Sequence, residues 1–388
     1  MRLLPFDYAI RNLGRSPLRL AMSVAGSLLV VVLVITAAAF VRGLERSLMG
    51  SGSTRNVMLL GAGSEESVER SEISASVPGQ AAATIAGIQE KMKTPFISPE
   101  VHAALAVSTS ENKTANAQAM FRGVRPEAFL VHPQVRIVEG RMFHPGKDEL
   151  IVGQLAATRL DLPRKRLGIG KDIWVDGRRW MIVGHFTAPH TVMNAEIWCS
   201  LTNLQIMTRR DSLSCVVMTL GQGEFADVDA FASKRLDLEL IAMRETDYYR
   251  KLVDFYQPVG KLVWVTAMLV ALGGIFGGLN TMYAAFASRI REIGMLQSIG
   301  FSRMAIVVSF VEESVVAASA GSVVALLVCM VWLDGLALRF SMGAFGMVLD
   351  APTIAIGLAA GVLLGLIGSL PPAARCLRMP IAESLKAT

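Results

Sequence analysis

The chain has 388 residues, of which 52% are hydrophobic and 18% charged, with a mean hydropathy of +0.46. Soluble domains are about 45–50% apolar and about 25% charged, and disordered chains are more polar still, so a single soluble domain and a disordered chain are both excluded. The net charge of +6 would suit nucleic acid, but the basic residues flank the long apolar runs. That placement indicates membrane orientation, and no nucleic-acid partner is expected.

Four apolar runs are long enough to cross a bilayer, whose core requires about 20 helical residues. We assign the spans to residues 21–41, 261–286, 304–333 and 353–371. The remaining segments are an amphipathic cytoplasmic helix (1–20), an extracytoplasmic domain with a stalk (42–260), a cytoplasmic helix (287–303), a short outer loop (334–352) and a cytoplasmic tail (372–388). The predicted fold is a membrane protein with four transmembrane α-helices and a large α+β domain between spans one and two.

Arginine and lysine in short flanks mark the cytoplasmic side of a membrane protein. They gather before the first span, after the second and after the fourth: Arg2, Arg11, Arg15, Arg19, Arg289, Arg291, Arg303, Arg375, Arg378 and Lys386. Both termini are therefore predicted to be cytoplasmic. The segment before the first span is long and amphipathic, so we do not expect that span to be a cleaved signal peptide.

Glycines recur at helical spacing in two of the spans. They are Gly273, Gly274, Gly277 and Gly278 in the second span and Gly357, Gly361 and Gly365 in the fourth. Small residues at this spacing let helix backbones approach closely in lipid. Two interpretations are open: packing among the four helices of one chain, or an interface with a second copy.

A short charged segment follows the second span. It contains charged residues, apolar residues and two glycines. The residues that we single out are Arg289, Arg291, Glu292, Ile293, Gly294, Leu296, Gly300 and Arg303. Gly300 is the predicted helix stop. The segment is too short and too polar to cross a bilayer, and it suits an interfacial helix or one that docks into a groove on a cytoplasmic partner.

This segment resembles the hallmark of the FtsX/MacB-like ABC transporter permease family. The residues that carry the resemblance are Asn280, Thr281, Met282, Arg289, Arg291, Glu292, Ile293, Gly294, Phe310, Glu313 and Ser314, whereas Ser288 stands where the family commonly has an acid. The C-terminal end resembles the family's ending through Pro372, Ala373, Arg375, Arg378, Pro380, Glu383 and Leu385. The order of one span, a large outer domain and three further spans is also the family's.

The resemblance implies a multi-pass permease subunit of the bacterial inner membrane that dimerises and binds a cytoplasmic ABC ATPase subunit. It makes Arg289 to Arg303 the helix that couples to the ATPase, whose ATP-driven motion does work on a substrate outside the membrane (mechanotransmission). ATP and Mg²⁺ would bind the partner ATPase, since this sequence has no Gly-x4-Gly-Lys-Ser/Thr loop. Besides membrane lipid, a periplasmic adaptor protein is a further partner that the family suggests.

Glu312 and Glu313 lie about two turns inside the third span, where acidic groups are costly and mark functional sites. We expect a structural role near the headgroups, with hydrogen bonds to polar neighbours such as Asn280. A proton relay is the alternative.

The segment from 42 to 260 is predicted to alternate strands and helices. Strands are expected at Val57, Ile151, Ile173, Trp180, Cys215 and Leu240, and helices over 80–91, 153–160, 201–209 and 225–235. Glu245 to Pro258 carries aromatic and apolar residues at helical spacing and is predicted to be a stalk helix interrupted at Pro258.

No catalytic, cofactor-binding or metal site is predicted, because His-Glu-x-x-His and Gly-x-Ser-x-Gly do not occur. The five histidines, all in this domain, are expected to be isolated surface residues: His102, His132, His144, His185 and His190. Cys199 and Cys215 either form a disulfide in an oxidising compartment or stay free and buried. Cys329 and Cys376 are expected to be unbridged.

The leading functional hypothesis is therefore an export or efflux permease that works with an ATPase chain. The alternatives are a non-transporting signalling subunit that controls an extracytoplasmic enzyme, and a membrane sensor.

Overall fold

The computed structural model describes residues 6–110, 117–333, 335–340 and 343–378. The chain divides into two compact units. The helical unit comprises Met1–Arg42, Pro258–Leu336 and Met347–Thr388, and the sheet unit comprises Gly43–Gln257 and Ala337–Gly346.

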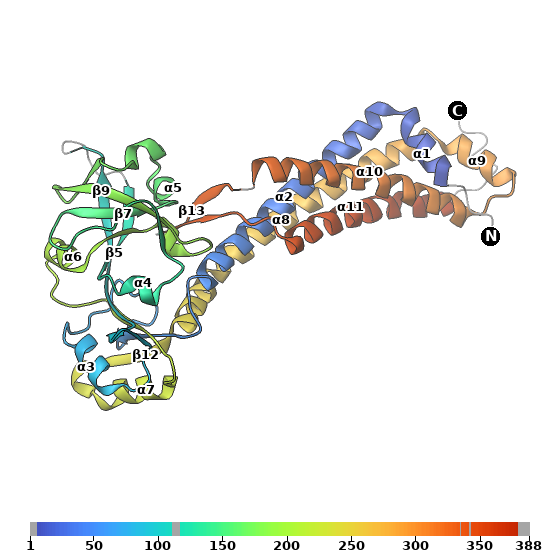
Figure 1. The fold of residues 1–388 in the computed structure, drawn as a ribbon. Helices are drawn as coiled ribbons and strands as arrows, with labels where there is room; N and C mark the ends of the chain where they lie inside the picture. The colour runs from blue at the N-terminus through green and yellow to red at the C-terminus, as the bar shows by residue number, and fades with distance from the viewer. Residues whose placement is uncertain (1–5, 111–116, 334, 341–342, 379–388) are drawn as a thin grey trace. The chain divides into compact units, whose positions relative to one another are not determined.

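The helical unit contains four long apolar helices that run alongside one another (Figure 1). They are α2 (Pro17–Met49), α8 (Glu245–Ala287), α10 (Arg303–Trp332) and α11 (Ala351–Arg378), and each is long and apolar enough to cross a membrane. Two shorter helices, α1 (Phe6–Arg15) and α9 (Ile290–Ser298), flank them in the chain. The prediction of four apolar membrane helices is confirmed.

Pro258 lies inside α8, so the predicted interruption of the helix there is wrong. A proline removes one backbone donor, which weakens a helix locally. Here the helix continues beyond the proline for 29 residues, to Ala287. The α2 and α8 helices each contribute residues to both units.

Small residues bring α2, α10 and α11 into close contact. The Ser27 hydroxyl of α2 donates a hydrogen bond of 3.0 Å to the Ala318 carbonyl of α10. A Cβ atom at Gly357 would meet Ile35, and one at Gly361 would meet Ser322. A Cβ at Gly365 would meet α10 in the same way. The glycines of the fourth span thus serve packing within the chain.

The glycines of α8 differ. Of the four glycines predicted to pack in the second span, only Gly274 would bring a Cβ against a neighbour, Val30, whereas Gly273, Gly277 and Gly278 face open space among the described residues. In the most apolar stretch of α8, only 6% of the residues are buried within the chain.

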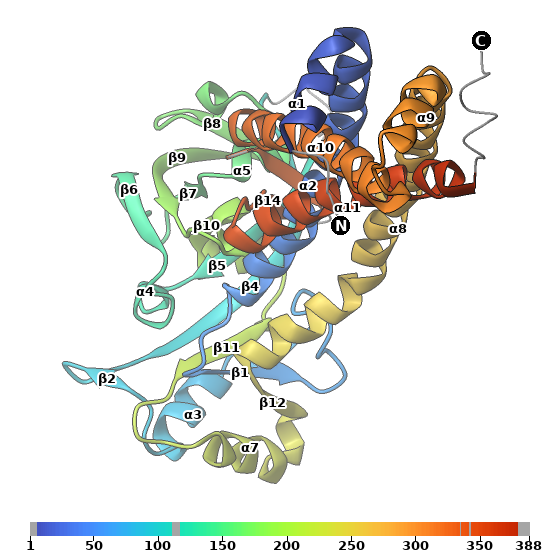
Figure 2. The same ribbon diagram turned by 90° about the vertical axis from the view of Figure 1, so that its right-hand side faces the viewer.

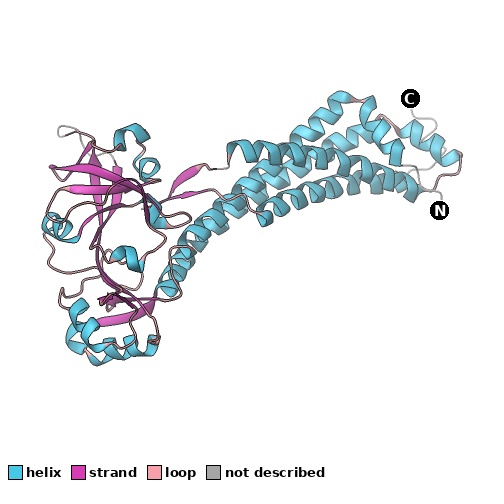
Figure 3. Cartoon of the chain, in the orientation of Figure 1, coloured by secondary structure: helices cyan, strands magenta, loops and turns pink. Residues whose placement is uncertain are grey.

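The sheet unit is built on a ten-stranded sheet with the order β12-β1-β11-β4-β5-β10-β7-β9-β6, in which β8 pairs with β4 and β9 (Figures 2 and 3). The strands are β1 (Asn56–Gly61), β4 (Ile97–Ser108), β5 (Ala117–Val124), β6 (Arg136–Gly140), β7 (Glu149–Gly153), β8 (Asp172–Val175), β9 (Arg178–Thr187), β10 (Ile197–Ser200), β11 (Cys215–Thr219) and β12 (Leu240–Arg244). Two hairpins stand apart from it: β2 (Glu90–Lys91) with β3 (Thr94–Pro95), and β13 (Ala337–Phe340) with β14 (Gly343–Gly346).

The long strand β4 joins the two halves of this sheet (Figure 2). Its first residues pair with β11, up to Glu100 opposite Cys215. From Val101 onward it pairs with β5 instead. The strand therefore changes partner at Glu100.

Two apolar cores pack against the sheet, one around Phe121 and Trp180 and the other around Phe186 and Trp198, and all four side chains are fully buried. Short helices accompany the strands. They are α3 (Val77–Thr84), α4 (Ala128–Val131), α5 (Ala156–Leu160), α6 (Leu201–Thr208) and α7 (Phe225–Lys234), with 3-10 turns at Arg164–Leu167, Val192–Ala195 and Leu236–Leu238. The predicted α+β domain between the first two spans is confirmed.

All six predicted strands are present, as are the helices at 201–209 and 225–235. The helix expected over 80–91 begins earlier and ends at Thr84, because the chain turns extended at Ile85 and Gly87 needs a positive φ of 77°. The helix expected over 153–160 is shortened to α5. Strands β4, β5, β6 and β10 and the hairpin β13–β14 were not predicted.

Candidate functional site

The helix α9 presents one buried and one exposed face. Ile293 packs against Ile306, Phe310 and Ala373 in a small apolar core. On the other side, Met295 is 54% and Ile299 is 68% exposed. Gly300 follows with a φ of 104°, as the predicted helix stop requires. The Ser302 hydroxyl then caps α10 by accepting a hydrogen bond from the Ala305 amide at 3.2 Å.

Charged side chains tie this helix to its neighbours, and we call Tyr8, Arg15, Arg289, Glu292 and Glu313 the α9 cluster. Arg289 Nε donates to Glu292 Oε2 at 3.0 Å, and its Nη1 donates to Glu313 Oε2 at 2.9 Å. Tyr8 of α1 donates to Glu292 Oε1 at 2.5 Å, and Arg15 approaches the same oxygen at 3.4 Å. Arg289 thus links α9 to α10, and Glu292 links α9 to α1.

The electrostatics keep this cluster charged. Burial works against ionisation of Glu292, but hydrogen bonds from Tyr8 and Arg289 outweigh it and lower the pKa of that carboxyl. Burial and the hydrogen bond to Glu292 raise the pKa of the Tyr8 hydroxyl, so it stays a neutral donor. Burial also opposes the charge on Arg289, yet its two carboxylate partners raise its pKa.

The remaining residues predicted for this region are placed as follows. Gly294 is buried, Leu296 is half-buried, and Arg291 and Arg303 are exposed. For Glu313, for which polar neighbours such as Asn280 were expected as partners, the structure shows a hydrogen bond of 2.9 Å from Arg289 in the adjacent segment. Glu312 Oε2 is buried without a hydrogen-bond partner among the described residues.

A second set of charges lies inside the sheet unit, and we call Glu100, His102, Arg122, His132, Glu196 and Glu245 the β4 network. At its centre Glu100 accepts hydrogen bonds from Arg122 at 2.7 Å and Ser98 at 2.8 Å. The imidazoles of His102 and His132 bond the same carboxylate at 3.1 Å and 2.8 Å. All four of these partners are at least 95% buried.

The guanidinium of Arg122 also forms a bidentate pair with Glu196, with distances of 2.7 Å and 2.8 Å. Trp198 completes this arrangement, because its Nε1 donates to Glu196 Oε2 at 2.8 Å and its ring lies 5.4 Å from the guanidinium. One cation therefore satisfies two carboxylates, one from β4 and one from the residue directly before β10.

The network continues to Glu245, the first residue of α8. Its carboxylate accepts hydrogen bonds from the Ser53 amide at 2.8 Å and the Asn56 amide group at 2.9 Å, and His132 Nδ1 lies 3.8 Å from it. The beginning of α8 is thereby tied to the strand that joins the two halves of the sheet.

The pKa directions describe a balanced set of charges. Burial alone would raise the pKa of Glu100, but Arg122 and His132 hold it well below its usual value. Burial would lower the pKa of His132, but Glu100 and Glu245 raise it. Burial and the nearby guanidinium lower the pKa of His102, so this ring stays neutral.

This network corrects two expectations from the sequence. His102 and His132 are buried and paired, so they are not isolated surface residues. Cys199 and Cys215 are free buried thiols, so the disulfide alternative is wrong. Cys329 is also free, and the side chain of Cys376 lies outside the described part of the chain. A sequence signal existed: Glu100 and His102, two residues apart on a strand, share one face.

Glu100, His102 and Cys215 bring three possible metal-ligand atoms within 4.8 Å of one another. However, the Arg122 guanidinium lies 2.7 Å from Glu100 Oε2 and would repel a metal cation. Burial and the charge of Glu100 raise the pKa of Cys215, which disfavours the thiolate that a metal requires. These residues do not fit a metal ion.

The chain matches two family models. Residues 20–234 match the MacB-like periplasmic core domain, which is more than half of the chain, and residues 264–381 match the FtsX-like permease C-terminal model. Among curated proteins it is similar to the macrolide export ATP-binding/permease protein MacB of Nitrobacter winogradskyi, with 36% identity over 122 residues. That match spans 31% of this chain and 18% of the relative.

Two solved structures are similar to this chain. The periplasmic region of MacB from Actinobacillus actinomycetemcomitans has 10% identity and a TM-score of 0.39, covering 53% of this chain and 94% of that one. The extracellular domain of the noncanonic ABC-type transporter YknZ from Gram-positive bacteria has 13% identity and a TM-score of 0.37, covering 48% and 99%.

Proposed function

The chain belongs to the FtsX-like ABC transporter permeases that carry a MacB-like periplasmic core domain, and we propose its function on that basis. It is a multi-pass membrane protein with a periplasmic domain, and membership of an ABC permease family implies an ATPase partner. In our proposal it is the permease subunit that couples ATP hydrolysis by that partner to conformational work on a substrate at the periplasmic side, for export or efflux.

The observation that carries this proposal is the two-faced geometry of α9. Its inner face is fixed to α1 and α10 by Glu292 and Arg289, whereas Met295 and Ile299 lie exposed on its outer face. A short helix with apolar anchors suits a groove on a cytoplasmic protein. Because α9 is held by charged hydrogen bonds to two neighbouring helices, a push on it is passed to them.

The sides of the membrane and the cofactors are part of the same proposal. We place both termini and α9 in the cytoplasm of a bacterial inner membrane, as the arginines of the short flanks favour. ATP and Mg²⁺ then act in the ATPase, and this chain needs no cofactor of its own.

The glycines of α8 support a second copy of the permease. Gly273, Gly277 and Gly278 leave open space on a helix that is little buried in its own chain. A second α8 could approach closely there, as small residues allow in lipid. We therefore propose a homodimer, in which α2 and α8 transmit the motion because each is one continuous helix with residues in both units.

Co-purification with a candidate ABC ATPase subunit from the same organism tests the proposal. The variant Met295→Asp puts a charge on the outer face of α9 and is expected to abolish association and ATP hydrolysis by the complex. The matched control is Met92→Asp, which alters a methionine that is 92% exposed in the sheet unit and should leave both unchanged. Unchanged association of Met295→Asp would contradict the proposal.

A further inference from the structure

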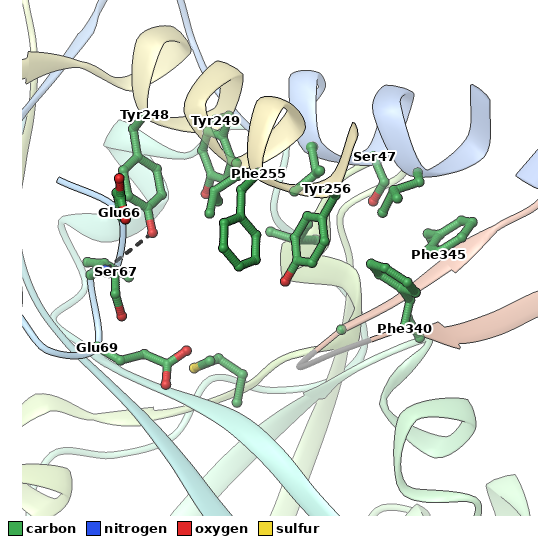
Figure 4. A pocket seen from close by; sticks show the side chains of 18 of the residues that line it. Ser47, Glu66, Ser67, Glu69, Tyr248, Tyr249, Phe255, Tyr256, Phe340 and Phe345 are labelled. Atoms are coloured by element: carbon green, nitrogen blue, oxygen red, sulfur yellow. Dashed lines mark hydrogen bonds between the residues drawn. The ribbon is translucent and has the colours of Figure 1, made fainter. Parts of the chain in front are cut away.

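The sheet unit contains a cavity of about 520 Å³ with an aromatic wall (Figure 4). The rings are Tyr248, Tyr249, Phe255, Tyr256, Phe340 and Phe345. The tyrosines and Phe255 come from the N-terminal part of α8, and the two remaining phenylalanines come from the hairpin β13–β14.

Part of this wall is fixed by ring contacts. The rings of Tyr256 and Phe340 meet edge-on with centroids 5.0 Å apart, and Phe255 meets Tyr256 in the same manner at 5.1 Å. Phe255 itself is 67% exposed, which leaves a large apolar side chain uncovered at the cavity. A ligand with an apolar body would cover it.

The opposite side of the cavity is polar and acidic. The loop from Glu66 to Arg70 is held there, because the Tyr248 hydroxyl accepts a hydrogen bond from the Val68 amide at 3.3 Å. Figure 4 shows Glu69 across the cavity from Phe255 and Tyr256, with its carboxylate extending along the side that faces these rings. Glu69 is half-buried and forms no hydrogen bond or ion pair through its carboxylate among the described residues, and burial raises its pKa.

The charged residues that line the cavity indicate the charge of the ligand. Two carboxylates, Glu66 and Glu69, and one exposed guanidinium, Arg70, give the lining a net charge of −1. An anion would be repelled, and an uncharged acyl chain would bury the carboxylate of Glu69 without any partner, which is costly. A cation satisfies Glu69 and is also attracted to the faces of aromatic rings.

We propose that this cavity binds an amphiphilic organic cation, with its charge against Glu69 and its apolar body along Phe255 and Tyr256. The proposal rests on the proposed function only where it makes such a cation a transport substrate. Binding is measured without any ATPase, so failure of this inference and failure of the coupling proposal are distinguishable.

The test uses two probes of nearly the same shape and opposite charge, tetraphenylphosphonium and tetraphenylborate. Their binding to the full chain in phosphatidylcholine nanodiscs is measured by calorimetry, with empty nanodiscs as the blank for partition into lipid. We expect saturable binding of the phosphonium alone. Glu69→Gln should weaken it about tenfold, as expected for loss of a partly desolvated charge contact, and Phe255→Leu should weaken it about threefold.

The matched control is Glu90→Gln, which removes an exposed carboxylate in β2 outside the cavity and should leave the affinity unchanged. Retained near-ultraviolet circular dichroism shows that each variant is folded. Equal affinity of wild type and Glu69→Gln for the phosphonium would overturn the proposal. A second outcome would also overturn it. If Glu69→Gln bound tetraphenylborate or a fatty acid more tightly than the wild type binds the phosphonium, the cavity would be a site for apolar anions such as lipids.

Discussion

The α9 cluster and the β4 network use the same device in different surroundings: one arginine bridges two glutamates from separate elements. The side chain of Arg122 is 3% exposed, and its two carboxylates are within 6% of full burial. The side chain of Arg289 is 12% exposed, and of its two carboxylates Glu313 is 6% exposed and Glu292 is 32% exposed. One set is closed to water, whereas the other is open to it on one side.

The difference has an energetic consequence. Removing one partner of a closed pair leaves an uncompensated buried charge, which costs about 3–5 kcal/mol. Exposed pairs are screened and contribute about 0–1 kcal/mol, and half-exposed ones lie between these limits. The β4 network therefore suits a fixed connection within the sheet unit, and the α9 cluster suits a connection that rearranges when a partner pushes on it.

The largest effect is expected from Arg122→Met, which leaves Glu100 and Glu196 buried without their cation. We expect a loss of about 3–5 kcal/mol in the stability of the sheet unit. Thermal unfolding followed by tryptophan fluorescence measures it, since Trp198 lies against Arg122. Arg250→Met, which breaks an exposed pair with Asp247, is the control and should show no measurable change. An equal loss of stability in the two variants would contradict the proposal that buried charge pairs contribute more to stability than exposed ones.

Arg289→Met tests the open set. The hydrogen bonds to Glu292 and Glu313 are lost, but water reaches the carboxylate of Glu292, so we expect a smaller loss of stability, about 2–3 kcal/mol. ATP hydrolysis by the complex with the ATPase should lose its dependence on the permease, because α9 is no longer fixed to α10. A loss of stability as large as that of Arg122→Met, with coupling intact, would reverse our assignment of the two sets.

The pH dependence of stability offers a subtler test. The folded-state pKa of His132 is raised above its unfolded value, so its contribution is fully present below about pH 6.5 and is lost as the pH rises through the folded-state pKa. Burial raises the pKa of Glu245, which also lowers stability with rising pH, but from about pH 4.5. Denaturant titrations from pH 6 to pH 9 should show a decline that is reduced in His132→Gln. If the stability of wild type and variant declined equally with pH, His132 would not contribute to the pH dependence of stability.

The smallest effect is expected from Tyr8→Phe, which deletes a single hydrogen bond to Glu292 without changing the ring. We expect a loss of about 1 kcal/mol or less in the stability of the helical unit. The ATPase complex should still form and couple, because Arg289 keeps α9 on α10. Full uncoupling by this variant would mean that α1, rather than α10, receives the motion of α9.

The two regions also differ in how far the sequence predicted them. The four spans and α9 follow from local patterns: charge-free runs, flanking arginines, and a glycine at 300 that ends the helix. The β4 network depends on pairing between β4 and β5, which sets His102 opposite Arg122. The charged residues of that network interrupt the alternation of apolar residues in β4 and β5. For this reason the sequence pattern did not predict these two strands. The contact of Tyr8 with Glu292 joins residues 284 positions apart, and no local pattern announces it.

The central claim is that the outer face of α9 contacts the ATPase. The most direct measurement places a cysteine on that face, Met295→Cys, labels it with a maleimide-benzophenone, and irradiates the chain together with its ATPase subunit. Met92→Cys is treated in parallel. Our account predicts a cross-linked permease–ATPase adduct from Met295→Cys and none from Met92→Cys. An ATPase complex that forms normally but yields no adduct at position 295, or equal adducts at both positions, would contradict it.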